Sequence, residues 1–375
     1  MASIQKRPDG RWRARYRDET GREHARHFAR KVDAERWAAS QVTDVARGVH
    51  IDPRAGKVTL GTYALAWAAG QVHRDSTRQT VESRLRLHVL PFLGDRPIGT
   101  IRKSEIQSWV RGRSDLLAAS TTRVVFSYVS AIFRAAVEDR LIPSSPCGRV
   151  QLPKRDRRRV EPLTVEVVRA LTDAISPRYR AVIVLAAGTG LRQGECFGLT
   201  LDRVDFLRQT LLVDRQMVML TGRPTALGPP KTAASVRTVP LPQVVVDELA
   251  AHLAAYPPGS DGLLFTNAHG RPINRASFAQ AWLPAARRAR LPEGESFHSL
   301  RHFYASLLIR HGESVKVIQA RLGHASAAES LDTYSHLWPD SEDRTRQAVD
   351  AVLAASADSV RTSETAKPQR RRSLP

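Results

Sequence analysis

The sequence predicts a multidomain protein with a small N-terminal sheet-plus-helix domain, an all-α domain and a mixed, mainly α (α+β) domain. The chain has 375 residues, more than one hydrophobic core usually supports. Apolar residues make up 42% of it, as in globular domains. The apolar pattern changes from strand-like alternation to helical spacing and then to a mixture. We therefore expect domains at residues 1–55, 56–155 and 160–345, and a partly disordered tail at 346–375.

The charge divides the chain in a similar way. Its 58 Lys and Arg residues exceed its 37 Asp and Glu residues, which gives a net charge of +21. Residues 1–159 carry 32 basic and 16 acidic side chains, whereas residues 160–344 carry 20 and 18. A basic half joined to a nearly neutral half favours a nucleic-acid partner.

Several classes of protein are excluded. No apolar run approaches the roughly 20 residues of a membrane span, and the first residues, MASIQKRPDG, lack a signal-peptide core. Two cysteines, Cys147 and Cys196, are too few for a disulfide framework or a cysteine-rich zinc site. We expect an intracellular protein with no membrane partner.

In the first domain, residues 3–17 alternate around the turn Pro8-Asp9-Gly10, and a second turn leads to an alternating run that ends at Phe28. A helical pattern follows from Asp33 to about Arg47. Three strands and one helix are predicted. Four arginines on one side of the alternation would form a basic strip on one sheet face. They are Arg11, Arg13, Arg15 and Arg17. The alternatives are a solvated face and a DNA-reading face, and the charge of the whole chain favours the second.

Helical spacing dominates the second domain, with runs at residues 60–69, 76–89, 103–111 and 120–138. A proline-containing connection follows and ends in the basic run KRDRRR at 154–159. Such a run is either a solvated linker or a contact with phosphates. Its candidate DNA-binding residues are Lys154, Arg155 and Arg157.

The third domain mixes both patterns. A strand-like block at residues 211–218 and 237–241 lies among helical runs. These runs cover residues 165–174, 179–187, 243–255, 277–290, 300–311 and 315–322.

Four short motifs of this domain are weak signals when each is taken alone. In GTGLRQGE, Gly188 and Gly190 are expected to end a helix, which leaves Arg192 on the turn. Its glycine spacing does not match a dinucleotide-binding loop. Lys231, in PPKT, lies between the strand-like blocks and is placed at a hairpin.

The other two motifs are HSLRH and the stretch from LGH to LDTYSH. His298 shares a helix face with Arg301 and with His302. The His-x-x-x-His spacing lacks the Glu of a zinc protease and a third ligand, so no metal is expected. His324 precedes Tyr334 by ten residues.

One reaction needs this whole set. A tyrosine hydroxyl can attack a phosphodiester to form a covalent phosphotyrosine, and the strand can be rejoined without ATP because the bond energy is kept. Arginines would stabilise the negative charge of the transition state. A lysine would protonate the departing oxygen, and histidines would hold the phosphate and move protons. No metal and no other cofactor are needed.

These residues resemble the catalytic domain of the tyrosine recombinases, or phage integrases. The matching stretches are GTGLRQGE, PPKTAASVRTVPL, HSLRH, RLGHAS and LDTYSH. The resemblance implies that Arg192 is the first phosphate-binding arginine and Lys231 the hairpin lysine. His298 and Arg301 would be the next pair.

By the same resemblance, His324 would occupy a position that holds His or Trp in the family, and Tyr334 would be the nucleophile. Glu195 would support the site without reacting, and His302 would act behind the residues that touch the phosphate.

The first half resembles the family less specifically. Residues 56–155 are similar to a helical core-binding (SAM-like) domain, and residues 1–55 to the arm-binding domain of many integrases. This implies an integrase of a phage or integrative element that acts on the bacterial nucleoid. Its expected partners are double-stranded DNA at core and arm sites of the attachment sequence, and three further copies of itself in a tetramer. A directionality factor or a host DNA-bending protein would be a further partner. Strands would be exchanged through a 3′-phosphotyrosyl intermediate and a Holliday junction.

Other functions remain as alternatives. A chromosome- or plasmid-dimer resolvase has the same chemistry but usually lacks the extra N-terminal domain, and a type IB topoisomerase would not need it. A DNA-binding regulator that has lost catalysis would lack a Tyr or an Arg of the motif set, and none is missing.

Overall fold

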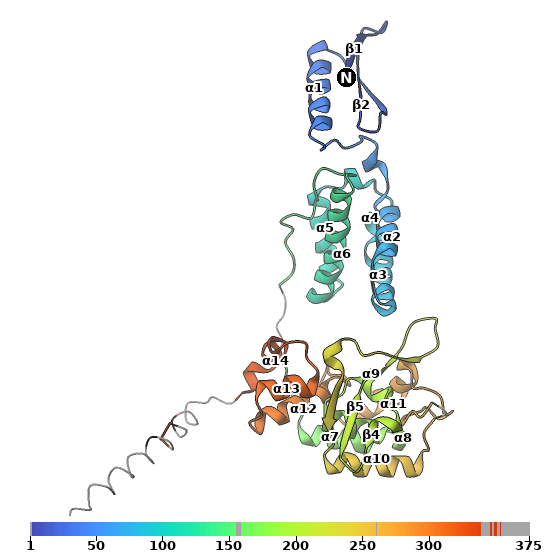
Figure 1. Cartoon of the computed structure of the whole chain (residues 1–375), viewed down its shortest axis with the longest axis vertical. Helices are drawn as coiled ribbons and strands as arrows, with labels where there is room; N and C mark the ends of the chain where they lie inside the picture. Colours follow the sequence, from blue (N-terminus) through green and yellow to red (C-terminus); the bar gives the residue numbers. More distant parts are fainter. Residues whose placement is uncertain are drawn as a thin grey trace, which may run out of the picture. The chain divides into compact units, whose positions relative to one another are not determined.

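The computed structural model describes residues 2–154, 159–259 and 261–338, together with residues 346, 349, 350 and 353. The chain divides into two compact units, residues 1–157 and 158–375. Figure 1 shows the elements of each unit. No helix in the described part of the chain is long and apolar enough to cross a membrane.

The first unit begins with an antiparallel sheet of three strands in the order β1-β2-β3. Helix α1 lies beside the sheet (Figure 1), and Ala14 of β2 packs with Ala34 and Ala38 of the helix in a small core. These alanines allow the helix to approach the sheet closely. Because side chains alternate along a strand, the arginines of β2 face away from the helix. The bounds are β1 Ser3–Lys6, β2 Trp12–Arg17, β3 Glu23–Phe28 and α1 Lys31–Ala46. The predicted strands and helix are confirmed.

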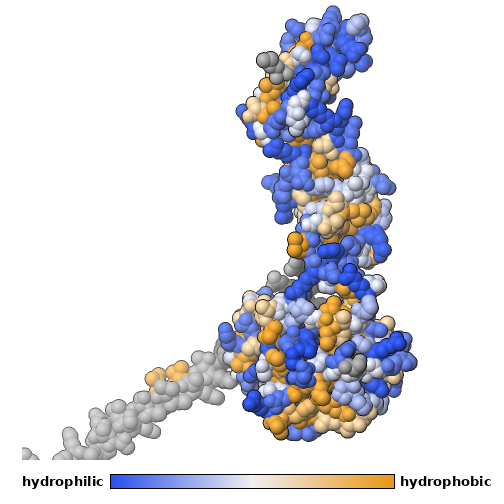
Figure 2. All heavy atoms as spheres, turned by 45° about the vertical axis from the view of Figure 1, so that its right-hand side comes forward, coloured by the Kyte–Doolittle hydropathy of each residue, from blue (hydrophilic) through white to orange (hydrophobic). Residues whose placement is uncertain are grey.

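The rest of the first unit is helical around a separate core. The predicted run at 76–89 forms one helix, which ends at His88, and a short helix with Pro91 in its first turn follows it. A proline is readily accommodated there, where its missing N–H costs nothing. The helices are α2 Leu60–Gly70, α3 Asp75–His88, α4 Leu90–Leu93, α5 Lys103–Ser114 and α6 Ala119–Glu138. In Figure 2, hydrophilic side chains cover much of the visible face of this unit.

The second unit is mainly helical and contains two small sheets. Its helices are α7 Val165–Ala174, α8 Pro177–Thr189, α9 Gln193–Phe197, α10 Gln243–Ala255, α11 Arg275–Arg288, α12 Ser299–Arg310, α13 Val315–Leu322 and α14 Ala327–Tyr334. One sheet has the antiparallel order β4-β5-β8 and the other is the hairpin β6-β7. Their strands are β4 Val204–Asp205, β5 Thr210–Val213, β6 Gln216–Val218, β7 Ala226–Gly228 and β8 Arg237–Pro240.

Two packed regions support this unit. Its main core contains an aromatic group in which Phe197 lies edge-on to Phe278, with ring centroids 4.9 Å apart. A smaller core joins α12, α13 and α14 and includes Tyr334. The motif that contains Tyr334 therefore packs in a hydrophobic cluster that is separate from the main core.

Two sequence expectations are wrong. Residues 211–218 do not form one strand, because Asp214 and Arg215 separate β5 from β6 and the two strands join different sheets. The Asp214 carboxylate accepts a hydrogen bond from Arg203 Nε at 2.8 Å. Gly188 does not end a helix but lies within α8, where a Cβ atom would come 2.5 Å from the Val245 side chain. A residue without a side chain is needed there for close helix packing.

Candidate active site

Arg192 is fixed by the turn between α8 and α9. Gly190, with φ of 66°, ends α8 in the left-handed region, where glycine is favoured. Arg192 then caps α9, and the Glu195 carboxylate accepts from its backbone N at 3.0 Å and from its Nη1 at 2.9 Å. The Arg192 side chain is 28% exposed. The capping interaction thus holds a guanidinium that still reaches solvent.

Arg301 connects three elements from the interior. It lies on α12 with 2% of its surface exposed. Its Nη1 donates to Gly190 O at 2.7 Å, and its Nη2 donates to Leu322 O at 2.6 Å. Burial and the charge of Arg192 lower the pKa of Arg301 to about 9. This value is above neutrality, so the guanidinium stays charged at neutral pH.

Tyr334 ends α14 and is 1% exposed. Its hydroxyl oxygen lies 2.8 Å from His302 Nδ1. Burial raises the pKa of Tyr334 to about 12. Burial, followed by the charge of Arg301, lowers the pKa of His302 to about 4. At neutral pH the pair therefore consists of a neutral imidazole and a protonated phenol.

The two other histidines flank this pair. His298 precedes α12 at the surface, and its ring is perpendicular to that of His302 with centroids 4.8 Å apart. The His324 ring is nearly parallel to that of Tyr334, and its Nδ1 lies 2.7 Å from Ser330 Oγ. The surrounding protein desolvates both histidines and lowers the pKa of each to about 4.

Lys231 lies outside the hairpin turn in which the sequence placed it. The hairpin is β6-β7, and Lys231 follows β7 in an exposed loop. The next residue, Thr232, has its hydroxyl 2.9 Å from the Ser235 hydroxyl, which accepts from Arg192 Nη1 at 3.4 Å. Lys231 is therefore close in sequence to the site, on a segment linked to Arg192.

Arg237 is a site residue that the sequence reasoning did not single out. It begins β8 and is 8% exposed. Its Nη2 donates to Glu195 Oε2 at 2.8 Å. Despite burial, which raises the pKa of Glu195, the hydrogen bond and charge of Arg237, assisted by Arg192, lower it overall. The sequence could have indicated this from position alone. Arg237 lies two residues before the buried Val239, so both side chains are on the same face of the strand.

The candidate DNA-binding residues all belong to the first unit of the chain. Arg13 and Arg15 share Glu23, with nitrogen–oxygen distances of 3.9 and 3.7 Å. The Nε atom of each is buried without a hydrogen-bond partner. Arg11 and Arg17 are exposed on the same strand region, and Lys154 is exposed at the end of the unit. Arg155 and Arg157 lie outside the described residues.

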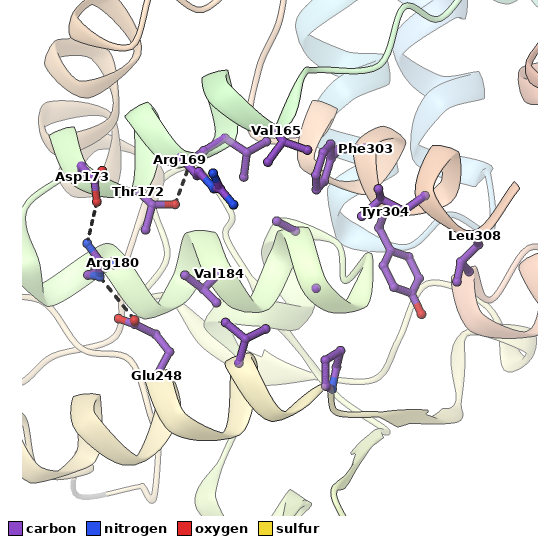
Figure 3. Close-up of a pocket in the computed structure, with 16 residues that line it drawn as sticks. Val165, Arg169, Thr172, Asp173, Arg180, Val184, Glu248, Phe303, Tyr304 and Leu308 are labelled. Carbon is purple, nitrogen blue, oxygen red and sulfur yellow. Dashed lines mark hydrogen bonds and ion pairs between the residues drawn. The ribbon is translucent and has the colours of Figure 1, made fainter. Parts of the chain in front are cut away.

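A separate apolar groove of about 680 Å³ lies among α7, α8, α10 and α12 (Figure 3). At one end Arg180 pairs with Asp173 at 2.9 Å and with Glu248 at 3.3 Å. None of the candidate catalytic side chains lines this groove. Within the described parts of both units, no group of three or more His, Cys, Asp or Glu residues could hold a metal ion.

Three stretches of the chain match known families. Residues 161–340 match the Phage integrase family, residues 2–47 the Phage integrase, N-terminal domain, and residues 60–152 the Phage integrase central domain. The chain is 28% identical over 340 residues to the prophage phiRv2 integrase of Mycobacterium tuberculosis, covering 87% of this chain and 89% of that one. It is 30% identical over 231 residues to the tyrosine recombinase XerD of the same species, covering 57% and 69%.

Solved structures share the fold. The Tn1549 transposon integrase in complex with circular intermediate DNA has a TM-score of 0.68 at 23% identity, covering 78% of this chain and 99% of that one. A lambda integrase tetramer bound to a Holliday junction has a TM-score of 0.57 at 19% identity, covering 87% and 96%. Matches along nearly the whole chain, together with the XerD relative, show that the protein is a phage or mobile-element integrase and belongs to the phage integrase family of tyrosine recombinases.

Proposed function

We propose that this integrase cuts and rejoins DNA with Tyr334 as its nucleophile. The observation that carries the proposal is the Tyr334 hydroxyl, which lies 2.8 Å from His302 Nδ1 in a site that also contains Arg192 and Arg301. The Tyr334 oxygen forms a bond to phosphorus while the bond from phosphorus to the 5′ oxygen breaks. A 3′-phosphotyrosine and a free 5′-hydroxyl result, and the reverse attack reseals a strand without ATP.

The two arginines hold the phosphate. Arg192 reaches solvent and Arg301 lies behind it. Hydrogen bonds to backbone carbonyl oxygens fix the planes of the two guanidinium groups, one bond from Arg192 and two from Arg301. A guanidinium fixed before the substrate arrives stabilises developing charge without rearranging during the reaction.

Protons move at two places. With its own proton on Nε2, His302 accepts the Tyr334 proton at Nδ1, because a bound phosphate adds negative charge that raises the low pKa of His302. Lys231, on its exposed loop, protonates the departing 5′ oxygen. His298 and His324 donate hydrogen bonds to the phosphate oxygens, and Glu195 orients Arg192.

Attack on DNA requires a movement of α14. Tyr334 is 1% exposed, so a phosphate cannot reach its hydroxyl in the present conformation. We expect DNA binding to shift the short helix that ends at this residue. Cleavage would then depend on assembly as well as on the chemistry of the site.

The first unit supplies DNA contacts in this proposal. The β2 face with Arg11, Arg13, Arg15 and Arg17 binds arm sites, the helical domain binds the core site, and the run that contains Lys154, Arg155 and Arg157 lies on phosphates. The domains would be residues 1–55, 56–155 and 160–345. Four copies would exchange strands through a Holliday junction at the nucleoid, with a directionality factor or a bending protein as further partners. Because these regions would contact many phosphates, we expect DNA binding to weaken steeply as the salt concentration increases.

The proposal is tested with a supercoiled plasmid that carries the DNA flanking the gene. The plasmid is incubated with protein in EDTA without ATP and quenched with detergent, and protein covalently attached to DNA is measured. We expect an adduct that Tyr334→Phe abolishes while noncovalent binding stays intact. Loss of binding in the same variant would contradict the nucleophile assignment.

A second experiment tests the arm-binding face. Replacing Arg11 and Arg13 with alanine should weaken binding to accessory sites and spare cleavage at the crossover. Equal loss of both would refute this assignment. If nicked suicide substrates with a mapped binding site gave no adduct, a non-catalytic DNA-binding regulator would be the better account.

A further inference from the structure

Three consecutive carbonyl oxygens at the C-terminal end of α13 each accept a hydrogen bond from a different arginine. The pairs are Arg237 Nε with Arg321 O at 2.7 Å, Arg301 Nη2 with Leu322 O at 2.6 Å, and Arg192 Nη2 with Gly323 O at 3.4 Å. Guanidinium groups suit the negative end of a helix. His324 follows directly, so this end of α13 positions it.

Arg237 also contacts the Glu195 carboxylate, through both of its terminal nitrogen atoms. Its Nη1 and Nη2 donate to the two Glu195 carboxylate oxygens at 3.3 and 2.8 Å. Glu195 also accepts from Arg192, and its side chain is 2% exposed. One buried carboxylate is thus divided between two guanidinium groups, of which Arg192 alone reaches solvent.

This division decides how much positive charge remains for a phosphate. Two arginines and one glutamate leave a net charge of +1 in the group. Without Arg237, Glu195 would neutralise Arg192 alone, and both carboxylate oxygens of Glu195 would be available to the Arg192 guanidinium. A guanidinium paired in this way with a carboxylate is a poorer partner for a phosphate, since the two anions compete for the same donors.

We propose that Arg237 is a positioning residue for strand cleavage. It keeps Arg192 available to the phosphate by sharing Glu195, and it holds the end of α13 that presents His324. This inference rests on the proposed function of Arg192 and His324. Arg237 itself does not touch the DNA, because its side chain is 6% exposed.

The test uses Arg237→Met, which removes the charge at similar length. We expect single-turnover formation of the covalent adduct on a nicked suicide duplex to slow by about 10- to 100-fold, the usual effect of losing a hydrogen bond between charged groups. Adding Glu195→Gln to Arg237→Met removes the carboxylate charge that would otherwise pair with Arg192 alone. The double variant should therefore cleave faster than Arg237→Met alone, which a purely structural role would not produce.

A second measurement does not depend on cleavage. Noncovalent binding to a duplex of arbitrary sequence is measured against salt in a Tyr334→Phe background. Arg237→Met should lower the slope of log affinity against log salt by about 0.9, the value for one lost phosphate contact. Glu195→Gln should restore the slope. A parent without a Tyr334-dependent adduct would refute the proposed function, whereas the slope still decides the role of Arg237.

The control is Arg203→Met, which removes another arginine paired with a carboxylate, Asp214 at 2.8 Å. It should change neither the rate nor the slope. Arg237→Lys keeps the charge, and we expect it to fold and to cleave at a rate between those of the parent and Arg237→Met. The proposal is overturned if Arg237→Met folds and behaves like the parent. It is also overturned if Glu195→Gln restores neither quantity, or if Arg237→Lys folds and Arg237→Met does not.

Discussion

Acidification should destabilise the second unit because His302 stays neutral in the fold. Its pKa falls from 6.5 to about 4 when the protein folds. The unfolded chain therefore takes up a proton first as the pH decreases. The stability contributed by the neutral ring is fully present above pH 6.5 and is lost progressively as the pH falls toward 4.

The magnitude follows from the two pKa values. One pH unit below 6.5, at pH 5.5, the unfolded state gains about 1.4 kcal/mol from this proton. His302→Gln removes the titration and retains a side chain that can hydrogen-bond to Tyr334. Between pH 7.5 and 5.5 the parent should lose about 1.4 kcal/mol more unfolding free energy than this variant. His324 also has a pKa of about 4 in the fold. Its protonation lowers the unfolding free energy of the parent and of the variant alike, so it does not affect the difference between them.

The assay is urea unfolding at both pH values, with folded protein quantified by pulse proteolysis and its fragments assigned by mass spectrometry. This separates the second unit from the first, which a single spectroscopic signal would not. His269→Gln, on an exposed turn, serves as the control and should follow the parent. Equal pH dependence of the parent and His302→Gln would refute the reasoning, as would an NMR titration that gives His302 a pKa above 6.

Three further outcomes are expected. Phe197→Ala removes a fully buried ring from the aromatic group of the main core and should cost about 3–5 kcal/mol of unfolding free energy, measured by urea denaturation. Ser326→Ala removes the hydroxyl that accepts from Glu329 N at the start of α14 and should cost about 1 kcal/mol, which a Ser326→Asn replacement should largely preserve. Cys147 and Cys196 are both buried with raised thiol pKa values, so a disulfide reagent should label neither until urea unfolds the chain. Rapid labelling of the native protein would contradict this burial.

Much of the helical framework could be predicted from the sequence. The bounds of α7, α10 and α13 agree with the predicted runs, because apolar residues at helical spacing are followed by clear breaks. The strand-like block at 211–218 was harder to interpret. Its apolar residues suggest one strand, and only the pairing of β5 with β8 and of β6 with β7 shows that the block is divided.

The candidate site shows the same contrast. The sequence motifs contain Arg192, Arg301, His302 and Tyr334, and the fold brings these four into one region. The role of Arg237 could not be predicted because its partners, Glu195 and the end of α13, are distant in the chain. A lone arginine in a strand gives no sign of which carboxylate it will meet. Lys231 has no fixed partner in the described structure, and its part in the reaction stays a prediction.

The small core under Tyr334 has a consequence for how the protein loses activity. It joins α12, α13 and α14 and is separate from the main core of the unit. Clusters with few members open at lower free energy than the rest of a domain. This region can therefore act as a local unfolding unit that withdraws the nucleophile while the main core of the second unit stays folded. An inactive but largely folded population, able to regain its active form by local refolding, is the state that such an arrangement produces.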